Sequence, residues 1–529
     1  MLIILLATLF VTVLIFAIKR NLTYLHIFQQ QEYYNYRFLS WIFANKAFDK
    51  RLSSLLLIIF LIINQFIINN FFIIIALCLI FLIFSYIEKN PIKQAKKKLV
   101  FTNRAKRIYY ISLIINILTN IVLFINLKYL NLFVVLLLNI HLIPAYLILA
   151  NLLLIPIENK IQKNFLSLAK QVLSTFKPFI IGITGSFGKT SVKHFLGHIL
   201  QHVDHTLITP GSINTPMGIS RIIREQLNAA HRYFIVEMGA YGLGSIKRIC
   251  ELTNPNMGII ISIGNAHYER FKSLEIVANT KFELADSVIN NNINAKVIIS
   301  DQTLNTNYAK QYIKDHSNNF EILNTQLINI TQLKTGLSIT LTWQNSTYTI
   351  ETPIFGKHHA NNIALAFISA CNLGIPPATI ITALKSMPQI NHRLEVIKHD
   401  NYTIIDDAYN SNPTGFKAAL ELLNFLHERP GRRILVTPGL IELGTAHTQE
   451  HLILGQDAAN ATDIAIVINP KRIPSFVNGF KEHANNTQEL ITLSCFKEAK
   501  AWLDKNCRTK DTVLLANDLP DLYETGLKL

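Results

Sequence analysis

The chain has 529 residues, of which 50% are hydrophobic and 16% are charged, and its formal net charge is +16. Residues 1–160 contain 16 Lys and Arg against 4 Asp and Glu, so most of the positive charge belongs to this first part. That charge lies between long apolar runs, which indicates membrane orientation, and the remainder has no basic stripe, so nucleic-acid binding is not expected. The five cysteines form no CxxC pair, which argues against a disulfide framework or a zinc site.

Long apolar stretches precede residue 160. They cover residues 2–18, 54–87, 109–127 and 130–155. Each is near or above the roughly 20 residues needed to cross a bilayer. Asn69 and Asn70 interrupt the second stretch and indicate a hairpin of two helices. We therefore predict an α-helical membrane region over residues 1–157, with about five transmembrane helices.

The positive charges in the loops predict how this region is oriented. Residues 19–51 carry six Lys and Arg, and residues 88–107 carry eight. Loops rich in these residues stay in the cytoplasm. We therefore expect a multi-pass protein of the cytoplasmic membrane, with its N-terminus outside, the lipid bilayer as a partner, and everything after residue 157 in the cytoplasm.

Residues 182–191, GITGSFGKTS, follow an apolar run and precede a helical pattern. A strand, a glycine turn and a helix N-terminus together form an anion site, because backbone N–H groups and the helix dipole face the phosphate. Lys189 adds a charge for the outer phosphates, and the Thr190 hydroxyl is a ligand for Mg²⁺. Ile183 stands where the common phosphate loop has its first glycine. The segment predicts binding of ATP.

After residue 177, short β-rich runs alternate with helical patterns, which predicts α/β domains with doubly wound parallel sheets. Ligands of such sheets bind at the carboxyl ends of the strands. Polar residues follow predicted strands at Glu237, at Asn265 and His267, and at Asp406 and Asp407. These positions are the candidate site.

Two further features divide this part of the chain. Residues 320–352 read as a small β-hairpin region, and a break near residues 388–392 separates a second α/β unit. We predict a central ATP-binding domain over residues 158–389 and a C-terminal domain over residues 390–529.

Eight segments in order resemble the Mur ligase family of ATP-dependent acid–amino acid ligases. They are residues 182–191, 209–219, 236–246, 263–284, 356–366, 392–396, 406–420 and 442–455. The resemblance implies an enzyme with a P-loop-type central domain and a Rossmann-like C-terminal domain. The segments are most similar to those of members that add D-alanyl-D-alanine to a muramoyl tripeptide.

The resemblance also implies roles for single residues. Binding of the ATP phosphates falls to Gly185, Ser186, Gly188, Lys189 and Thr190. Other nucleotide contacts fall to Asn362, Arg393, Asp407 and Asn412. The implied metal ligands are Thr190, Glu237, His267 and Lys281. Lys281 would bind the metal as a carbamate, formed when its amine reacts with CO₂. Substrate contacts fall to Asn214, Gly218, Tyr409 and Asn410, and the catalytic set is Lys189, Glu237, His267, Arg393 and Asp407.

The implied chemistry begins with attack of a substrate carboxylate on the γ-phosphate of ATP, which gives an acyl phosphate. The amine of an amino acid or dipeptide then displaces phosphate. Both steps concentrate negative charge, which explains the Mg²⁺, Lys and Arg. The partners are then a cell-wall precursor and an amino acid or dipeptide.

Two departures from the family pattern keep other functions open. Nothing before Lys177 resembles the small domain with which soluble relatives bind a uridine nucleotide, so a lipid-linked acceptor is an alternative. Pro438, Gly439 and Leu440 stand where relatives often have Gly-Asp-Met. The alternatives are a poly-γ-glutamate-type or other Mur-like ligase, an ATP-driven transporter, or an inactive scaffold.

Overall fold

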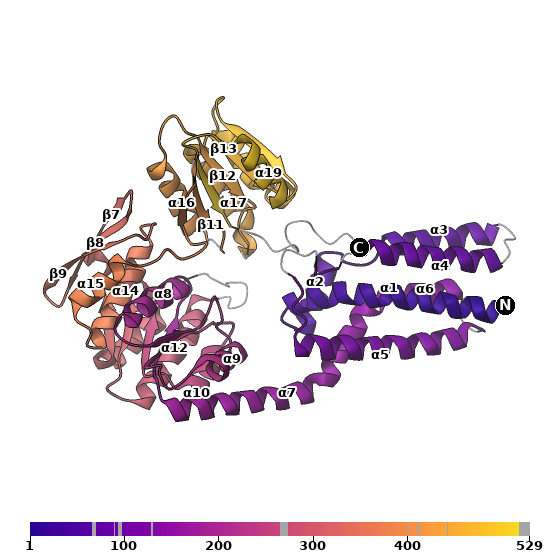
Figure 1. The fold of residues 1–529 in the computed structure, drawn as a ribbon, viewed down its shortest axis with the longest axis horizontal. Coiled ribbons are helices and arrows are strands. Elements are labelled where there is room, and N and C mark those ends of the chain that lie inside the picture. Colours follow the sequence, from indigo (N-terminus) through magenta and orange to yellow (C-terminus); the bar gives the residue numbers. More distant parts are fainter. Residues whose placement is uncertain are drawn as a thin grey trace. The chain divides into compact units, whose positions relative to one another are not determined.

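Figure 1 shows the chain as a computed structural model. The described residues are 1–65, 70–88, 90–93, 98–128, 131–264, 273–399, 401–409, 412–441 and 443–517. The chain divides into two compact units, one formed by Met1–Gln162 and the other by Lys163–Leu519. Each unit is described by itself.

The first unit is helical. Its helices are α1 (Leu2–Gln30), α2 (Asn35–Ala44), α3 (Arg51–Gln65), α4 (Asn70–Ile87), α5 (Asn103–Ile125), α6 (Leu132–His141) and the first part of α7 (Ile143–Phe176). Helices α1, α5 and α7 are long and apolar enough to cross a membrane, whereas the apolar helices α3, α4 and α6 are shorter. Two apolar clusters, with Phe28 and Phe81 at their centres, fill the space between them.

The apolar stretch over residues 130–155 is not one continuous helix, because the structure breaks it at Leu142 into α6 and α7. Pro144 is the second residue of α7. Proline lacks the N–H that a continuous helix would donate to the carbonyl of Ile140, so a helix boundary is favoured just before it. The helix that follows runs on to Phe176, well beyond the apolar stretch.

The second unit begins with a parallel six-stranded sheet in the order β2-β3-β1-β4-β5-β6. Its strands are β1 (Phe179–Thr184), β2 (Thr206–Ile208), β3 (Tyr233–Glu237), β4 (Met257–Ile260), β5 (Val297–Ser300) and β6 (Phe320–Leu323). The helices around it are α8 (Lys189–Gln201), α9 (Pro216–Gln226), α10 (Ser245–Thr253), α12 (Leu274–Asn291), α13 (Asn307–Asp315), α14 (His359–Asn372) and α15 (Pro377–Lys385).

Strand β1 shows why this sheet is covered on both faces. Ile181 and Ile183 join one buried cluster, with residues of α8 and α14, whereas Ile180 joins another, with residues of α9, α10 and α12. Alternate side chains of a strand point to opposite faces, so an apolar residue at successive positions requires helices on both sides. The predicted doubly wound sheet is confirmed.

The predicted hairpin region proves to be a three-stranded antiparallel meander. Its strands are β7 (Ile328–Leu333), β8 (Gly336–Trp343) and β9 (Ser346–Thr352), and they pair in sequence order. The first residues of the predicted region, Phe320–Leu323, instead form edge strand β6 of the main sheet. Leu337, Ile339 and Leu341 are two residues apart along β8, so they lie on the same face of the strand. They pack in the same core as α14, which fixes the meander against the central domain.

A second six-stranded sheet follows in the order β10-β11-β15-β12-β13-β14, in which only the β10–β11 pair is antiparallel. Its strands are β10 (Glu395–Lys398), β11 (Thr403–Asp407), β12 (Arg433–Thr437), β13 (Ile464–Ile468), β14 (Glu489–Leu493) and β15 (Thr512–Ala516). Its helices are α16 (Pro413–Leu426), α17 (His447–Ala461), α18 (Pro474–His483) and α19 (Phe496–Asn506). The Rossmann-like reading of this region is thereby supported.

His451 on α17 holds the turn after β12. It is fully buried, its Nδ1 donates to the carbonyl of His447 at 2.7 Å, and its Nε2 accepts from the N–H of Leu440 at 3.0 Å. These two bonds require the neutral ring protonated at Nδ1. Burial accordingly lowers the pKa of His451 to about 4.

We expect His451 to make the fold sensitive to acid. The unfolded chain takes up this proton near pH 6.5 and the folded chain only near pH 4, so stability is lost as pH falls through that window. The loss from this group is about 3 kcal/mol at pH 4. Urea unfolding of the detergent-solubilised protein at several pH values measures it. His451→Gln should flatten the slope, whereas the exposed His483→Gln should not; equal slopes for His451→Gln and wild type would contradict the assignment.

Candidate active site

The phosphate loop joins β1 to α8. Gly188 has φ of +82°, and a Cβ placed there would lie 2.6 Å from Oδ1 of Asn362. A Cβ on Gly185 would lie 3.0 Å from the carbonyl oxygen of Phe187. Both positions therefore need glycine, the first for its left-handed conformation and both for space. The turn leads directly into the N-terminus of α8, as an anion site requires.

Two expected phosphate ligands make other contacts in this structure. Lys189 curls back over the loop, and its Nζ donates to the carbonyl of Gly185 at 2.7 Å. Desolvation lowers the pKa of Lys189, while nearby Glu237 raises it. Ser186 braces the loop after β4, since its Oγ donates to the carbonyl of Gly264 at 3.0 Å and accepts from that residue's N–H. Lys189 thus lies at the phosphate loop, where it was expected to bind the outer phosphates of ATP.

Thr190 and Glu237 come together at the carboxyl ends of two neighbouring strands. Thr190 is the second residue of α8 after β1, and Glu237 is the last residue of β3, which pairs with β1. Thr190 Oγ1 donates to Oε2 of Glu237 at 3.0 Å, and Glu237 is almost fully buried. A hydroxyl and a carboxylate oxygen are ligands that Mg²⁺ prefers. The expected metal role of both residues fits this geometry.

Lys193 also belongs to this site, although the sequence motifs did not indicate it. Its side chain is fully buried, and its Nζ donates to Oε2 of Glu237 at 3.0 Å and to the carbonyl of Gly211. Burial lowers the pKa of Lys193, and the charge of Glu237 opposes that shift. The signal was its spacing: a lysine four residues after Lys189 in a helix lies on the same face.

Asn214 lies on the other side of the Glu237 carboxylate. Its Nδ2 donates to Oε1 of Glu237 at 3.4 Å, and its Oδ1 accepts from the hydroxyl of Tyr241 at 2.8 Å. Gly218 has a structural role, because a Cβ there would lie 2.7 Å from the side chain of Ile213. Its N–H donates to the hydroxyl of Thr215, which caps α9. Asn214 is thus placed near the site, whereas Gly218 shapes the helix start beside it.

Arg393 approaches this site from the segment before β10. Its guanidinium lies 4.8 Å from the centre of the Tyr409 ring, and the Tyr409 hydroxyl hydrogen-bonds to Ser212. Desolvation lowers the pKa of Arg393, while nearby Tyr409, Glu237 and Asp407 raise it. Arg393 and Asp407, which were expected to bind nucleotide, thus lie near Tyr409, which was expected to bind substrate.

Asp406 is not a solvated neighbour of Asp407 but stabilises the local fold. It is buried, its Oδ2 lies 2.8 Å from Nδ1 of His392, and its Oδ1 accepts from the N–H of Ala408. His392 directly precedes Arg393 and has φ of +60°. The pair therefore fixes the turn from which Arg393 extends.

The remaining expected residues divide into three groups. Lys281 is buried in α12, and burial together with the charge of Lys189 lowers its pKa well below the ordinary range. A neutral amine of this kind is the form that reacts with CO₂. Asn412 caps α16, with its Oδ1 accepting from the N–H of Gly415. His267 and Asn410 lie outside the described residues.

These residues fit ATP and Mg²⁺. The side chain of Asn362 lies next to Gly188 of the phosphate loop. Helix α8 presents its N-terminus to a phosphate. Thr190 and Glu237 supply two oxygen ligands for a divalent cation. Lys189, Arg393 and Lys193 supply positive charge around them. When bound, Mg²⁺ would offset charge on the phosphate oxygens.

Comparison with known proteins identifies the domains. Residues 183–370 match the Mur ligase middle domain, and residues 392–517 match the Mur ligase glutamate ligase domain. The chain belongs to the Mur ligase family. The expected central and C-terminal Mur ligase domains are thus confirmed, and the phosphate loop, Glu237, Asn362, Arg393 and Asp407 all lie within the matched residues.

The chain is similar to several UDP-N-acetylmuramoyl-tripeptide–D-alanyl-D-alanine ligases. It is 29% identical to that of Buchnera aphidicola subsp. Baizongia pistaciae over 318 residues, which cover 59% of this chain and 68% of that protein. It is 30% identical to that of Bacillus subtilis over 289 residues, covering 54% and 61%. The match with the Escherichia coli ligase is 28% over 319 residues, covering 59% and 70%. The chain spans about two thirds of the length of these relatives.

Solved structures show the same fold. MurF from Acinetobacter baumannii matches with a TM-score of 0.57 and 23% identity, over 68% of this chain and 78% of that one. MurF ligase from Thermotoga maritima, solved in complex with ADP, matches with a TM-score of 0.56 and 22% identity, over 68% and 80%. The Mur ligase fold is therefore present in the part of the chain that carries the candidate site.

We expect Thr190→Val to abolish the Mg²⁺-dependent part of ATP binding, because the methyl group keeps the shape of the side chain but removes the oxygen ligand. Calorimetric titration with ATP, in Mg²⁺ and in EDTA, measures it, and the loss should be tenfold or more in affinity, about 1.4 kcal/mol. Thr280→Val is the matched control, since that hydroxyl donates to the carbonyl of Ile276 within α12. Equal titrations of Thr190→Val and wild type would refute the metal role of Thr190.

Proposed function

We propose that the chain is an ATP-dependent amide ligase that adds D-alanyl-D-alanine to a muramoyl tripeptide during peptidoglycan precursor synthesis. The observation that carries the proposal is the Thr190–Glu237 pair beside the phosphate loop, with Asn214 and Tyr409 close to it. The named relatives point to the same reaction, since all three carry the name of this ligase.

The reaction requires two transfers. A carboxylate oxygen of the peptide attacks the γ-phosphorus of ATP, and the bond to the β-phosphate oxygen breaks, so ADP leaves. The amine of the dipeptide then attacks the acyl carbon, phosphate leaves, and the amine gives up a proton. Negative charge grows on phosphate oxygens in the first step, where Lys189 and Arg393 supply positive charge. The ring of Tyr409 under Arg393 helps to hold that guanidinium in place.

Phosphate release tests the ligase proposal. The full-length protein in detergent is given Mg²⁺, ATP, UDP-muramoyl tripeptide and D-alanyl-D-alanine, with each omitted in turn. Release should require both peptide substrates, and Lys189→Ala should reduce it at least a hundredfold, because it removes a charge that binds the outer phosphates.

Other outcomes of this assay would identify the alternatives. Release with glutamate alone would indicate a poly-γ-glutamate-type ligase. Release only with a lipid-linked tripeptide would retain the ligase reaction and replace its acceptor. ATP hydrolysis independent of any of these substrates would contradict the ligase proposal.

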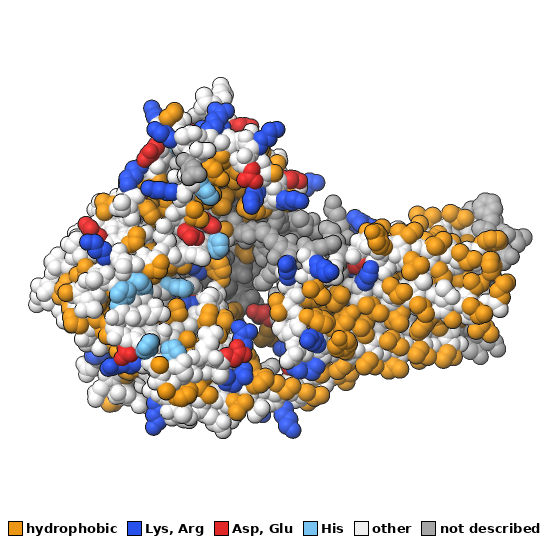
Figure 2. Space-filling model, viewed as in Figure 1, with side chains coloured by type: hydrophobic (Ala, Val, Ile, Leu, Met, Phe, Trp, Pro, Cys, Tyr) orange, Lys and Arg blue, Asp and Glu red, His pale blue; other side chains and the backbone are white. Residues whose placement is uncertain are grey.

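We also propose that the first unit lies in the cytoplasmic membrane. Its surface is densely covered by hydrophobic side chains, as Figure 2 shows on the helical part. Exposed apolar side chains occur along α1, α3, α4, α5 and α7, with examples at Ile4, Leu61, Ile83, Leu118 and Leu153. Soluble proteins rarely expose apolar patches of this extent, whereas bilayer-spanning helices require them.

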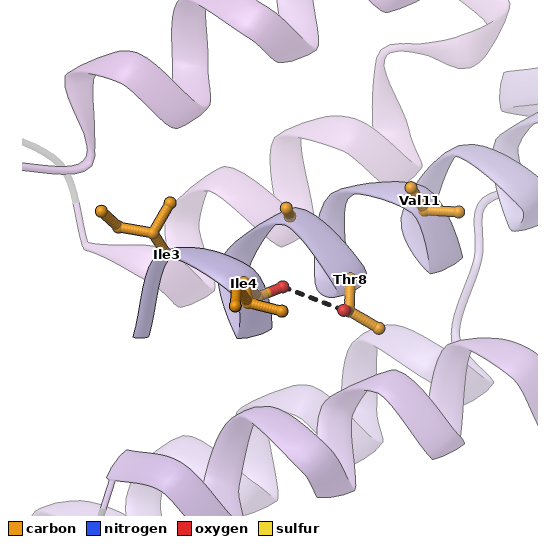
Figure 3. Close-up of a pocket in the computed structure, with 5 residues that line it drawn as sticks. Ile3, Ile4, Thr8 and Val11 are labelled. Carbon is orange, nitrogen blue, oxygen red and sulfur yellow. Dashed lines mark hydrogen bonds between the residues drawn. The ribbon is translucent and has the colours of Figure 1, made fainter. Parts of the chain in front are cut away.

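A groove on α1 supports the same proposal. Ile3, Ile4, Ala7, Thr8 and Val11 line it, and Figure 3 shows their side chains along one stretch of the helix. The Thr8 hydroxyl donates to the carbonyl of Ile4 at 2.9 Å. The polar side chain in this groove is thus satisfied within its own helix, as a lipid-facing surface requires.

The membrane proposal predicts how the protein fractionates. It should stay with membranes after a carbonate wash and require detergent for release, because burial of apolar helices in lipid is effectively irreversible. Cysteine labelling tests the orientation: a Leu57→Cys variant lies within α3 and serves as the lipid-buried control, whereas Lys46→Cys should react only when the cytoplasmic side is open. Labelling of Lys46→Cys from outside intact cells would overturn the predicted orientation.

A further inference from the structure

Lys193 and Thr190 bind the same oxygen atom. Oε2 of Glu237 accepts from Nζ of Lys193 at 3.0 Å and from Oγ1 of Thr190 at 3.0 Å. The second carboxylate oxygen, Oε1, accepts from Nδ2 of Asn214. Among the described residues, the Glu237 carboxylate therefore has three hydrogen-bond partners, and the charged one of these three is a fully buried ammonium group.

A buried ammonium group and a buried carboxylate stabilise each other only while the pair is intact, because each charge has lost its water. A divalent cation coordinated by Thr190 Oγ1 and by Oε2, the carboxylate oxygen nearest to Thr190, would take the oxygen that Lys193 contacts. It would also place two further positive charges within a few ångströms of Nζ, where repulsion is strong at low effective dielectric. Lys193 and the cation therefore compete for Glu237.

Lys193 also has a second acceptor, the carbonyl of Gly211. The next residue, Ser212, hydrogen-bonds to Tyr409, and Asn214 follows two positions later. The side chain thus connects α8 to a loop that reaches both Glu237 and the ring beneath Arg393. If the Glu237 carboxylate coordinates a divalent cation, Lys193 can still donate its hydrogen bond to the carbonyl of Gly211.

We infer that Lys193 is a positioning residue that hydrogen-bonds to Glu237 until a divalent cation binds, and then gives up that carboxylate while it keeps its bond to Gly211. The exchange keeps Glu237 ionised and correctly placed before the cation arrives. It also limits how tightly a cation binds. The inference deepens the proposed function, because it rests on Glu237 being a metal ligand.

Binding of Mn²⁺ alone tests this inference without reference to catalysis. Titration of the full-length protein in detergent, followed by electron paramagnetic resonance of free Mn²⁺, gives the affinity. Lys193→Met removes the competing charge and keeps the length of the side chain, so Mn²⁺ should bind about tenfold more tightly than in wild type. Lys296→Met is the matched control, since Nζ of Lys296 donates to the carbonyl of Asn318 at 2.7 Å.

Two further variants separate the possible outcomes. Glu237→Gln should lose Mn²⁺ binding, and Lys193→Met in that background should restore none of it. If Glu237→Gln binds Mn²⁺ like wild type, the metal role of Glu237 is wrong and the inference fails with it. If Glu237→Gln loses binding but Lys193→Met leaves it unchanged or weaker, the inference alone is wrong.

A substrate readout distinguishes positioning from simple support of the fold. Loss of the bond to Gly211 should raise the KM for the peptide acceptor at least fivefold in Lys193→Met and change the KM for ATP less. Lys193→Gln retains a donor without the charge and should show the same Mn²⁺ gain, which keeps the test valid if Lys193→Met does not fold. Thermal melting of each variant checks folding, and equal increases in both KM values would overturn the positioning role.

Discussion

The site depends on a single buried carboxylate. Glu237 ends β3 beside β1, and it is surrounded by Lys193, Thr190 and Asn214. A buried charge in this position is tolerable only because each carboxylate oxygen has a hydrogen-bond partner and because the ammonium group of Lys193 contacts it. Removing the carboxylate would leave the buried Lys193 without a counter-ion, so the fold and the chemistry of this region depend on the same group.

The parallel sheet explains why these partners meet. The phosphate loop follows β1, Glu237 ends β3, and the segment with Gly211 and Asn214 follows β2. Strands β2, β3 and β1 are neighbours in the sheet, so their carboxyl ends form one edge. The C-terminal domain contributes Arg393 and Tyr409, and Asp406 with His392 sets the turn that carries Arg393. Candidate site residues from both domains of this unit thus lie around one position.

The helical unit is governed by a different physical constraint. Its apolar residues are in excess of what an internal core needs, and many of them face outward. Its buried charges are compensated internally, since Arg20 pairs with both Asp49 and Glu88. Such pairing is what allows ionised groups at the ends of apolar helices. The unit therefore pairs the buried charge of Arg20 inside and presents apolar side chains outside.

The sequence determined the elements whose signals are local. The glycine turn before α8, the alternation of strands and helices, and the apolar stretches were all readable, because each depends on neighbouring residues. Pro144 marks the position of the break between α6 and α7, but hydropathy alone does not say whether a proline kinks a helix or ends it. Only the tertiary structure showed that Lys193 and Thr190 share one oxygen of Glu237, and that Ser186 and Asp406 bond within the protein. Those contacts join residues far apart in the chain, and their partners are set by strand order and burial, which no local pattern specifies.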